Sequence, residues 1–238
     1  MQIPEIFVLA GGFGTRLRSV TGGLPKPLAP VAGIPFLYHL VDNWYRQGAR
    51  NFSFLLHHEA TMVKACIDQA QSENRWPDSS VRCITETTPL GTAGAVAHAI
   101  SETNLKGPFM VANADTWLGS GLHDVAQCEA PAMATIRVTD TERYGRVKIE
   151  NDIVVAFEEK ESGCGAGQIN AGLYKLLPAH FDRWLGQSAS LEYDVFPALI
   201  AQGKIKAISI ETEFIDIGIP DDYQSFCRWV EQGRRGAL

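Results

Sequence analysis

The sequence is poor in cysteine and in positive charge, and it has no long apolar run. Its 238 residues include five cysteines, none in a Cys-x-x-Cys spacing, which predicts reduced thiols rather than disulfide bonds or a zinc site. Lysine and arginine number 21 against 27 acidic residues, a formal net charge of −6, which argues against a broad surface for DNA or RNA. No run approaches the ~20 apolar residues that span a bilayer, and the start lacks the basic region of a signal peptide. We therefore expect a cytoplasmic protein.

Several common catalytic motifs are also missing. No Gly-Lys-Ser/Thr follows the first glycine-rich stretch, and Leu17 stands where a dinucleotide-binding fingerprint has its third glycine. The histidines show no His-Glu-x-x-His spacing, and no Gly-x-Ser-x-Gly elbow is present. These absences count against a P-loop, a dinucleotide-binding motif, a zinc hydrolase and a serine hydrolase.

The sequence does contain alternating strand-like and helix-like segments. The short apolar run Ile6–Leu9 predicts a strand buried on both faces, and the apolar spacing from Phe36 to Gln47 predicts a helix. In the first half we predict strands over 6–9, 52–56, 81–85 and 109–111, and helices over 36–47, 61–70 and 91–100. Repeated β–α units imply a parallel sheet with helices on both faces.

After about residue 130 the pattern changes. Strands with short turns are predicted over 132–138, 145–150, 154–158, 169–176 and 205–210, with helical pieces near Asp182 and Val195 and a final helix from Pro220 through Val230. A more antiparallel region is therefore expected here. We find no internal linker and expect one domain, with no further domain after the last helix.

Polar clusters at strand ends are the first candidates for chemistry, because ligands of open α/β sheets bind beyond the carboxyl ends of the strands. The first predicted strand leads into Gly11-Gly12-Phe13-Gly14-Thr15-Arg16, whose glycines let backbone N–H groups approach an anion and whose arginine can hold phosphate oxygens. In Pro25-Lys26-Pro27 the two prolines stiffen the chain around a lysine. The alternatives are a flexible turn and a solvent-facing lysine, but the two cations together favour a phosphate site.

Two aspartates form the other candidate. Asp115 follows a predicted strand, and Asp216 stands within an apolar run, Phe214–Gly218. A carboxylate in apolar surroundings needs a partner, and Mg²⁺ held by one or two carboxylates plus substrate phosphates supplies one. The structural alternatives are a helix N-cap for Asp115 and a salt bridge for Asp216. Taken together with the cations, the pair favours a metal–phosphate site.

These stretches together resemble the sugar-1-phosphate nucleotidylyltransferase family. The family's motifs match Leu9–Leu17 with Pro25–Leu28, Glu86 with Pro89–Ala95, Asn113–Thr116, Tyr144-Gly145, Glu158–Lys160, Ile169–Tyr174 and Asp216–Pro220. Within the family the chain is most similar to the short D-glycero-D-manno-heptose 1-phosphate guanylyltransferases. The grounds are Arg143-Tyr144-Gly145, Ser190-Leu191-Glu192, Phe214–Tyr223 and the lack of a C-terminal domain.

The resemblance implies an α/β fold of the nucleotide-diphospho-sugar transferase type. This fold is Rossmann-like, with a mostly parallel mixed sheet flanked by helices and a small antiparallel region on the sugar side. Residues 1–130 would form the nucleotide-binding half of a single domain, and residues 131–238 the sugar-binding half.

It also implies the reaction NTP + sugar 1-phosphate → NDP-sugar + pyrophosphate, with Mg²⁺ as cofactor. GTP and D-glycero-α-D-manno-heptose 1-phosphate are the expected substrates, giving GDP-heptose for a surface polysaccharide. Alternatives with the same chemistry are a mannose-1-phosphate guanylyltransferase and a uridylyl- or thymidylyltransferase. A non-catalytic nucleotide-sugar sensor is disfavoured, because it would not need all of Arg16, Lys26, Asp115 and Asp216. The oligomeric state stays open, with a homodimer as one option.

Residue roles follow from the same resemblance. The expected catalytic residues are Arg16, Lys26 and Asp115. Arg16 and the glycine loop would hold the β- and γ-phosphates that leave, Lys26 would neutralise the α-phosphate, and Asp115 and Asp216 would hold Mg²⁺. The nucleotide-binding set is Leu9, Ala10, Gly11, Gly12, Gly14, Thr15, Arg16, Lys26, Glu86, Pro89, Gly91, Thr92 and Asn113. The sugar-phosphate-binding set is Ala114, Tyr144, Gly145, Glu159, Lys160, Asn170, Gly172 and Glu192.

Three of these positions carry a further expectation. Glu86 is expected to accept hydrogen bonds from guanine N1–H and N2–H₂, or alternatively to cap the turn that follows it. Ala114 replaces the glycine that is usual before the metal aspartate, and Ile219 stands where threonine is common. Neither change removes a charged group, so activity is still expected.

Overall fold

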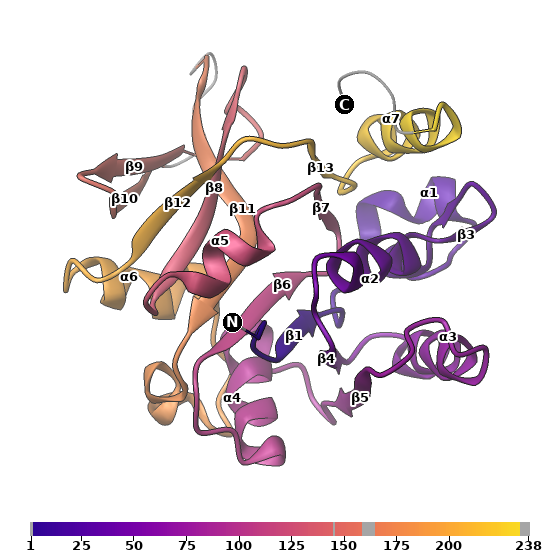
Figure 1. Cartoon of the computed structure of the whole chain (residues 1–238), viewed down its shortest axis with the longest axis horizontal. Helices are drawn as coiled ribbons and strands as arrows, with labels where there is room; N and C mark the ends of the chain where they lie inside the picture. The colour runs from indigo at the N-terminus through magenta and orange to yellow at the C-terminus, as the bar shows by residue number, and fades with distance from the viewer. Residues whose placement is uncertain (1, 145, 159–164, 234–238) are drawn as a thin grey trace.

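The computed structural model describes residues 2–144, 146–158 and 165–233, apart from the side chains of Thr15, Arg18 and Ser19 (Figure 1). The strands are β1 (Ile6–Leu9), β2 (Pro30–Val31), β3 (Ile34–Pro35), β4 (Asn51–Leu56), β5 (Ser80–Thr85), β6 (Phe109–Asn113), β7 (Thr116–Leu118), β8 (Ala132–Val138), β9 (Arg146–Glu150), β10 (Ile153–Glu158), β11 (Gly167–Leu176), β12 (Lys206–Ile210) and β13 (Phe214–Asp216). The α-helices are α1 (Arg18–Thr21), α2 (Phe36–Arg46), α3 (Ala60–Ser72), α4 (Gly91–Thr103), α5 (Leu122–Gln127), α6 (Phe196–Ile200) and α7 (Pro220–Glu231). Shorter helical turns are η1 (Thr15–Leu17), η2 (Lys26–Leu28), η3 (Pro178–His180), η4 (Asp182–Trp184) and η5 (Leu191–Val195).

The main sheet is mixed, as predicted. Among the described residues it has nine strands in the order β5-β4-β1-β6-β11-β8-β12-β10-β9. β5, β4, β1 and β6 pair in parallel, in agreement with the β–α units of the first half. β11 runs antiparallel between β6 and β8, β12 returns parallel to β8, and the β9–β10 hairpin completes that edge in antiparallel pairing. The antiparallel region is therefore a continuation of the parallel sheet (Figure 1).

The longer predicted elements are present, with bounds that differ by at most about three residues. The sequence did not indicate two small sheets, β2 with β3 and β7 with β13, because two or three residues are too few to show a period. Helix α5 was also missed. None of the helices in the described part of the chain is long and apolar enough to cross a membrane.

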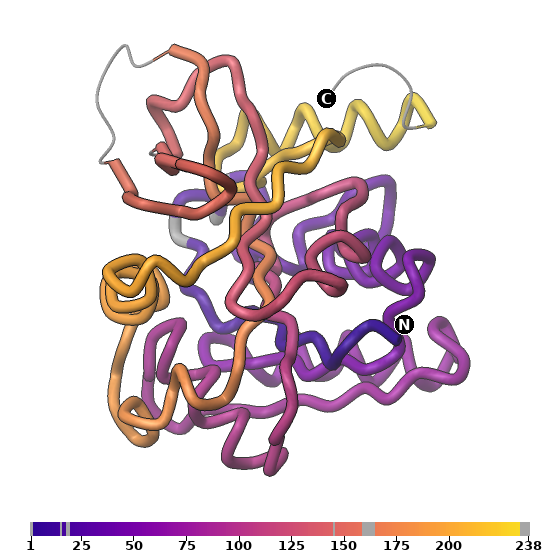
Figure 2. Tube along the Cα trace, turned by 60° about the vertical axis from the view of Figure 1, so that its left-hand side comes forward, coloured from indigo at the N-terminus to yellow at the C-terminus, as the bar shows by residue number. Residues whose placement is uncertain are grey.

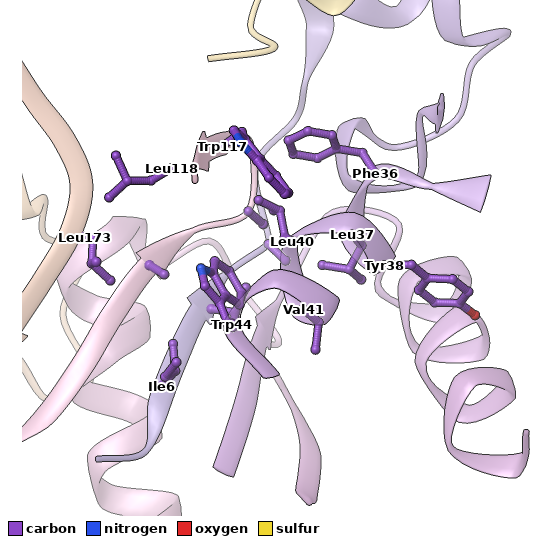
Figure 3. Packing of buried hydrophobic residues seen from close by; sticks show 14 of the residues in the cluster. Ile6, Phe36, Leu37, Tyr38, Leu40, Val41, Trp44, Trp117, Leu118 and Leu173 are labelled. Atoms are coloured by element: carbon purple, nitrogen blue, oxygen red, sulfur yellow. The ribbon is translucent and has the colours of Figure 1, made fainter. Parts of the chain in front are cut away.

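Helices cover both faces of the sheet because its central strands are apolar on both sides. Ile6 and Val8 of β1 belong to one core, which includes residues of α2, α3 and α7, whereas Phe7 belongs to the other core, with residues of α4, η5 and α6. Figure 3 shows part of the first core, with Trp44 of α2 pointing toward Ile6. This two-sided burial fixes the position of β1, and so the point at which the loop after it begins.

The last helix packs against the first half of the chain. In Figures 1 and 2, α7, coloured yellow, lies against the indigo and purple part of the molecule. Phe226 of α7 packs edge-on against Phe36 of α2, with ring centroids 5.1 Å apart, and its ring centroid lies 5.3 Å from that of Trp117 in β7. The packing of α7 therefore holds the preceding strand, β13, close to the end of β6.

Candidate active site

The carboxyl ends of parallel strands form the edge at which the candidate residues meet. Leu9, the last residue of β1, lies opposite Asn113, the last residue of β6. The glycine loop after β1 and Asp115 after β6 therefore project from the same edge. The backbones come close together here, since a Cβ at Gly11 would lie 3.0 Å from the backbone nitrogen of His57, which follows β4.

Lys26 lies between the two candidate metal aspartates. Its Nζ donates hydrogen bonds to Asp115 Oδ2 at 2.8 Å and to Asp216 Oδ1 at 3.3 Å, across 89 and 190 positions of sequence. Lys26 begins η2 between Pro25 and Pro27, and its side chain is 13 % exposed. Two carboxylates therefore share one ammonium group at a largely buried position.

The small β7–β13 sheet brings the two aspartates together. In this antiparallel pair, Asp216 lies opposite Thr116, the residue that follows Asp115. The Gly218 N–H donates to Asp216 Oδ1 at 2.7 Å, and the Thr116 hydroxyl donates to Asp115 Oδ1 at 3.2 Å. A strand, not a helix, follows Asp115, so the N-cap alternative is wrong. The ion pair considered for Asp216 is present, and its partner is Lys26.

The electrostatics of this pair fit a bound cation. Burial, and then the negative charge of Asp115, raise the pKa of Asp216, and a divalent cation would relieve this repulsion. Both carboxylates offer hard oxygen donors, and the described residues contain no group of three or more His, Cys, Asp or Glu side chains that could hold a metal. The donor set fits Mg²⁺, which accepts one or two carboxylates and completes its shell with water and substrate phosphates.

A cavity of about 200 Å³ lies beside Lys26. It is lined by Leu9, Ala10, Gly12, Gly14, Arg16, Lys26, Pro27, Ala114, Asp115 and Gly218. Gly14 has a φ of +56°, and a Cβ there would lie 3.1 Å from the Cβ of Lys26, so glycine lets the loop pass close to the lysine. The lining includes glycine backbone, a guanidinium and an ammonium group, which suits a polyphosphate.

A second cavity, of about 340 Å³, adjoins the first, and Leu9, Gly12 and Asp115 line both. The remainder of its lining is Gly11, Phe13, Leu55, His57, Glu86, Pro89, Gly91, Thr92, Ala95, Asn113 and Glu192. The predicted nucleotide-binding residues other than Thr15 therefore line these two adjoining cavities. Thr15 lies in η1 next to Arg16.

Glu86 is buried on the wall of the second cavity, with 8 % of its surface exposed. One carboxylate oxygen, Oε2, accepts a hydrogen bond from the Leu90 N–H at 2.8 Å, so Glu86 does cap the turn, with one of its two oxygens. Burial raises the pKa of this carboxyl group. The turn does not use Oε1, which leaves an acceptor for a ligand.

Glu192 lies on the same cavity as Glu86. Its Oε2 accepts hydrogen bonds from the hydroxyls of Thr92 at 3.3 Å and Ser190 at 2.9 Å. The segment that carries Glu192 packs tightly on the start of α4: Gly91 has a φ of +69°, and a Cβ there would lie 2.5 Å from the Ala189 carbonyl oxygen. Residues 189–192 and the first turn of α4 thus pack together, and Gly91, Thr92 and Glu192 from these segments line the second cavity, where the predicted nucleotide-binding residues lie.

The other predicted sugar-binding residues lie in several places. Ala114 is buried and lines the first cavity, and Tyr144 packs edge-on against Phe214, with ring centroids 5.7 Å apart. Asn170 and Gly172 belong to β11. Gly145, Glu159 and Lys160 lie outside the described residues.

Strand β11 comes close to Asn113, one of the predicted nucleotide-binding residues, at Gly172. The Gly172 N–H donates to Asn170 Oδ1 at 3.0 Å, and the Asn170 amide donates to the Tyr174 hydroxyl at 2.8 Å. Gly172 has a φ of +72°, and a Cβ there would lie 2.9 Å from Asn113 Nδ2. Glycine is needed for this close approach, which brings the two predicted binding sets together at Asn113.

Sequence reasoning assigned no binding role to Phe13, His57 or Gly218. The Phe13 side chain is 55 % exposed, and Phe13 and His57 line the second cavity. Gly218 lines the first cavity, and a Cβ there would lie 2.9 Å from Asp216 Oδ1. Phe13 and Gly218 stand inside the quoted motifs, but neither carries a charge or a reactive group that would have singled it out.

Comparison with known proteins identifies the family. A family model described as nucleotidyl transferase matches residues 6–232. The chain belongs to the nucleotidyl transferase family. A D-glycero-alpha-D-manno-heptose 1-phosphate guanylyltransferase from Aneurinibacillus thermoaerophilus is 32% identical over 228 residues, which cover 92% of this chain and 95% of the relative. A mannose-1-phosphate guanylyltransferase from Mycobacterium tuberculosis is 34% identical over 229 residues, 92% of this chain but 62% of the relative.

A solved structure supports the same placement. The crystal structure of HddC from Yersinia pseudotuberculosis complexed with GMP-PN matches this nucleotidyl transferase with a TM-score of 0.82 and 32% identity, over 95% of this chain and 99% of that chain. The family resemblance, the enzyme class and the fold class that we predicted are therefore confirmed.

Proposed function

We propose that this nucleotidyl transferase moves GMP from GTP to D-glycero-α-D-manno-heptose 1-phosphate, giving GDP-heptose and pyrophosphate. The observation that carries the proposal is the position of Lys26 between Asp115 and Asp216, where the two cavities share Asp115. The guanylyltransferase relatives support the choice of GTP. The heptose 1-phosphate relative, 95% of which aligns with this chain, supports the choice of sugar.

The proposed reaction needs no general base. The phosphate of a sugar 1-phosphate is already a competent nucleophile, and the difficulty is to bring two polyanions together and to stabilise charge at the α-phosphorus. The glycine loop and Arg16 would hold the β- and γ-phosphates that leave as pyrophosphate. Lys26 would face the α-phosphate and stabilise the charge that builds up there during in-line displacement.

Asp115 and Asp216 would hold Mg²⁺ next to Lys26. The bound ion would supply further neutralisation of phosphate charge. The chain already fixes one oxygen of each carboxylate, through the Thr116 hydroxyl and the Gly218 N–H. These local hydrogen bonds orient the two carboxylates without a substrate.

Glu86 is our candidate for reading the guanine base. Its Oε1 is free of the turn that Oε2 caps, and a carboxylate can accept from both N1–H and N2–H₂ of guanine. Uracil and thymine have one N–H and cytosine has an amino group at another position, so these bases would fit such an acceptor less well. Low exposure strengthens the effect, because a buried acceptor without its donor is costly.

Replacing Glu86 with glutamine is therefore expected to lower kcat/KM for GTP by about 10–10²-fold, mainly through KM. The glutamine oxygen can still accept from Leu90, so thermal unfolding should change little. Pyrophosphate release measured with GTP, ATP, UTP and CTP checks both points, and the wild type should prefer GTP. Turnover of the wild type with UTP and not GTP would contradict the guanylyl assignment, and an unchanged KM for GTP in the variant would contradict the role of Glu86.

Mannose 1-phosphate is the second candidate sugar, because the 34% identical Mycobacterium tuberculosis relative is named for it. Pyrophosphate release with saturating GTP and either sugar phosphate separates the two. We expect kcat/KM to be higher by about 10-fold or more with the heptose 1-phosphate, as missing contacts to a substrate hydroxyl group cost about 1–3 kcal/mol. A higher value with mannose 1-phosphate would overturn the choice of sugar and leave the guanylyl transfer in place.

A further inference from the structure

The turn between β8 and β9 is attached to the Asp216 segment at two points. The Arg143 guanidinium donates to the carboxylate of Asp222, and the Tyr144 ring packs edge-on against Phe214. Phe214 lies two residues before Asp216 on β13, and Asp222 lies in the first turn of α7. The two attachment points therefore lie on either side of the aspartate along the chain.

The same turn, residues 141–144, is also joined to the start of β11. The backbone N–H and the hydroxyl of Thr141 both donate to the Gly165 carbonyl oxygen at 3.1 Å. Arg146 donates to the Thr141 hydroxyl and to the Ala166 carbonyl oxygen, each at 3.1 Å. A continuous set of contacts thus runs from β11 and β9 through residues 141–144 to β13 and α7.

The Arg143–Asp222 contact differs from an ordinary surface ion pair. The Asp222 side chain is only 19% exposed and that of Arg143 is 41% exposed, so the pair is partly shielded from water. A charge-assisted hydrogen bond is stronger in such a position than on the open surface. The pKa of Arg143 is raised chiefly by this bond. Arg143 therefore acts on this segment through its bond to Asp222.

The aspartate pair has a structural reason to need such support. Asp115 and Asp216 repel each other, and Lys26 offers one positive charge for two negative ones. β13 is only three residues long and pairs only with β7 among the described strands. The Ile217 N–H donates to the Asp115 carbonyl oxygen at 3.0 Å and so joins the two main chains at this point, while the contacts of Phe214 and Asp222 hold the segment on either side of the Asp216 side chain.

We propose that Arg143 is a positioning residue, which through Asp222 holds Asp216 where it can share one cation with Asp115. The proposal rests on the metal-binding role proposed above for the aspartates. Arg143 itself would not bind the cation, because its partner is Asp222. The contact also ties residues 141–144, which include the predicted sugar-binding residue Tyr144, to the segment that carries Asp216.

Binding of Mn²⁺ alone, followed by the loss of the free-ion EPR signal, tests the proposal without turnover. Arg143→Ala and Asp222→Asn are each expected to weaken Mn²⁺ binding by about 10-fold, the lower end of the range for residues that support metal ligands. Exchanging the charges, with Arg143→Asp and Asp222→Arg in one chain, restores the ion pair and should bring binding back to within about 3-fold of the wild type. A purely local loss of fold would not be repaired by the exchange, so recovery identifies the ion pair as the cause. Unchanged Mn²⁺ affinity in the single variants, or no recovery in the exchanged pair, would overturn the proposal.

Two controls separate this proposal from the metal assignment itself. Lys148→Ala removes an exposed ion pair with Glu150 on the neighbouring strand β9, and it should leave Mn²⁺ affinity unchanged. Asp216→Asn should abolish most of the binding. If Asp216→Asn binds Mn²⁺ as the wild type does, the metal assignment fails. If it loses binding while Arg143→Ala and Asp222→Asn keep theirs, only the positioning role fails.

Discussion

Replacing Lys26 with alanine is expected to lower kcat by about 10²-fold or more, with a much smaller change in the KM for GTP. The reason lies in the position of Lys26. Its ammonium group lines the phosphate cavity next to Asp115, at the junction with the second cavity, where charge at the α-phosphorus would develop. A group that acts mainly on the transition state changes kcat more than ground-state binding. Pyrophosphate release at varied GTP, with saturating sugar 1-phosphate, measures both constants.

Three further measurements make the Lys26 result specific. Lys26→Arg keeps the charge but not the compact ammonium group, and it should recover part of kcat. Lys64→Ala removes an exposed pair with Asp68 on α3; neither residue lines either cavity, so the change should have no effect. Thermal unfolding of each variant shows whether the chain is folded. A Lys26→Ala enzyme with raised KM and unchanged kcat would contradict the role given to this lysine.

Replacing Asp216 with asparagine is expected to lower activity by about 10²–10³-fold. The rate of the variant should no longer rise with Mg²⁺ concentration as the wild-type rate does. The amide oxygen can still accept from the Gly218 N–H, so the loop after β13 keeps its hydrogen bond. What is lost is a negative charge that would hold the cation. Pyrophosphate release measured over a range of Mg²⁺ concentrations, beside wild type and Asp68→Asn as an exposed control, tests this expectation.

Thermal unfolding separates a metal role for Asp216 from a structural one. The pKa of Asp216 is raised by burial and by Asp115, so the folded chain holds the charged form less readily than the unfolded chain does, and the charge costs stability near neutral pH. Removing it should leave the melting temperature unchanged or higher while activity falls. A lower melting temperature with activity retained would show that Asp216 is structural only.

Part of this site could be predicted from the sequence, because some residues directly follow strands with clear apolar patterns. The glycine loop follows Ile6–Leu9 and Asp115 follows the strand that starts at Phe109, so their shared position at one sheet edge follows from parallel topology. Lys26 was recognisable from its two flanking prolines and its nearness to Arg16. For these residues, local sequence and sheet topology were sufficient.

Other parts depend on contacts that no local pattern shows. Asp115 and Asp216 meet through β7 and β13, three residues each and about a hundred residues apart, and strands so short have no readable period. Glu192 was assigned to the sugar, but the packing of residues 189–192 on α4 places it on the cavity that holds Glu86. The attachment of Arg143 to Asp222 likewise depends on α7 packing back onto the first half of the chain.

The fate of labelled phosphate tests the central claim most directly. GTP labelled at the α-phosphate, incubated with the chain, Mg²⁺ and D-glycero-α-D-manno-heptose 1-phosphate, is predicted to pass its label to a nucleotide sugar. GTP labelled at the γ-phosphate should pass its label to pyrophosphate, because the bond broken lies between the α- and β-phosphates. Release of the γ label as orthophosphate, or its transfer to the sugar, would contradict the account.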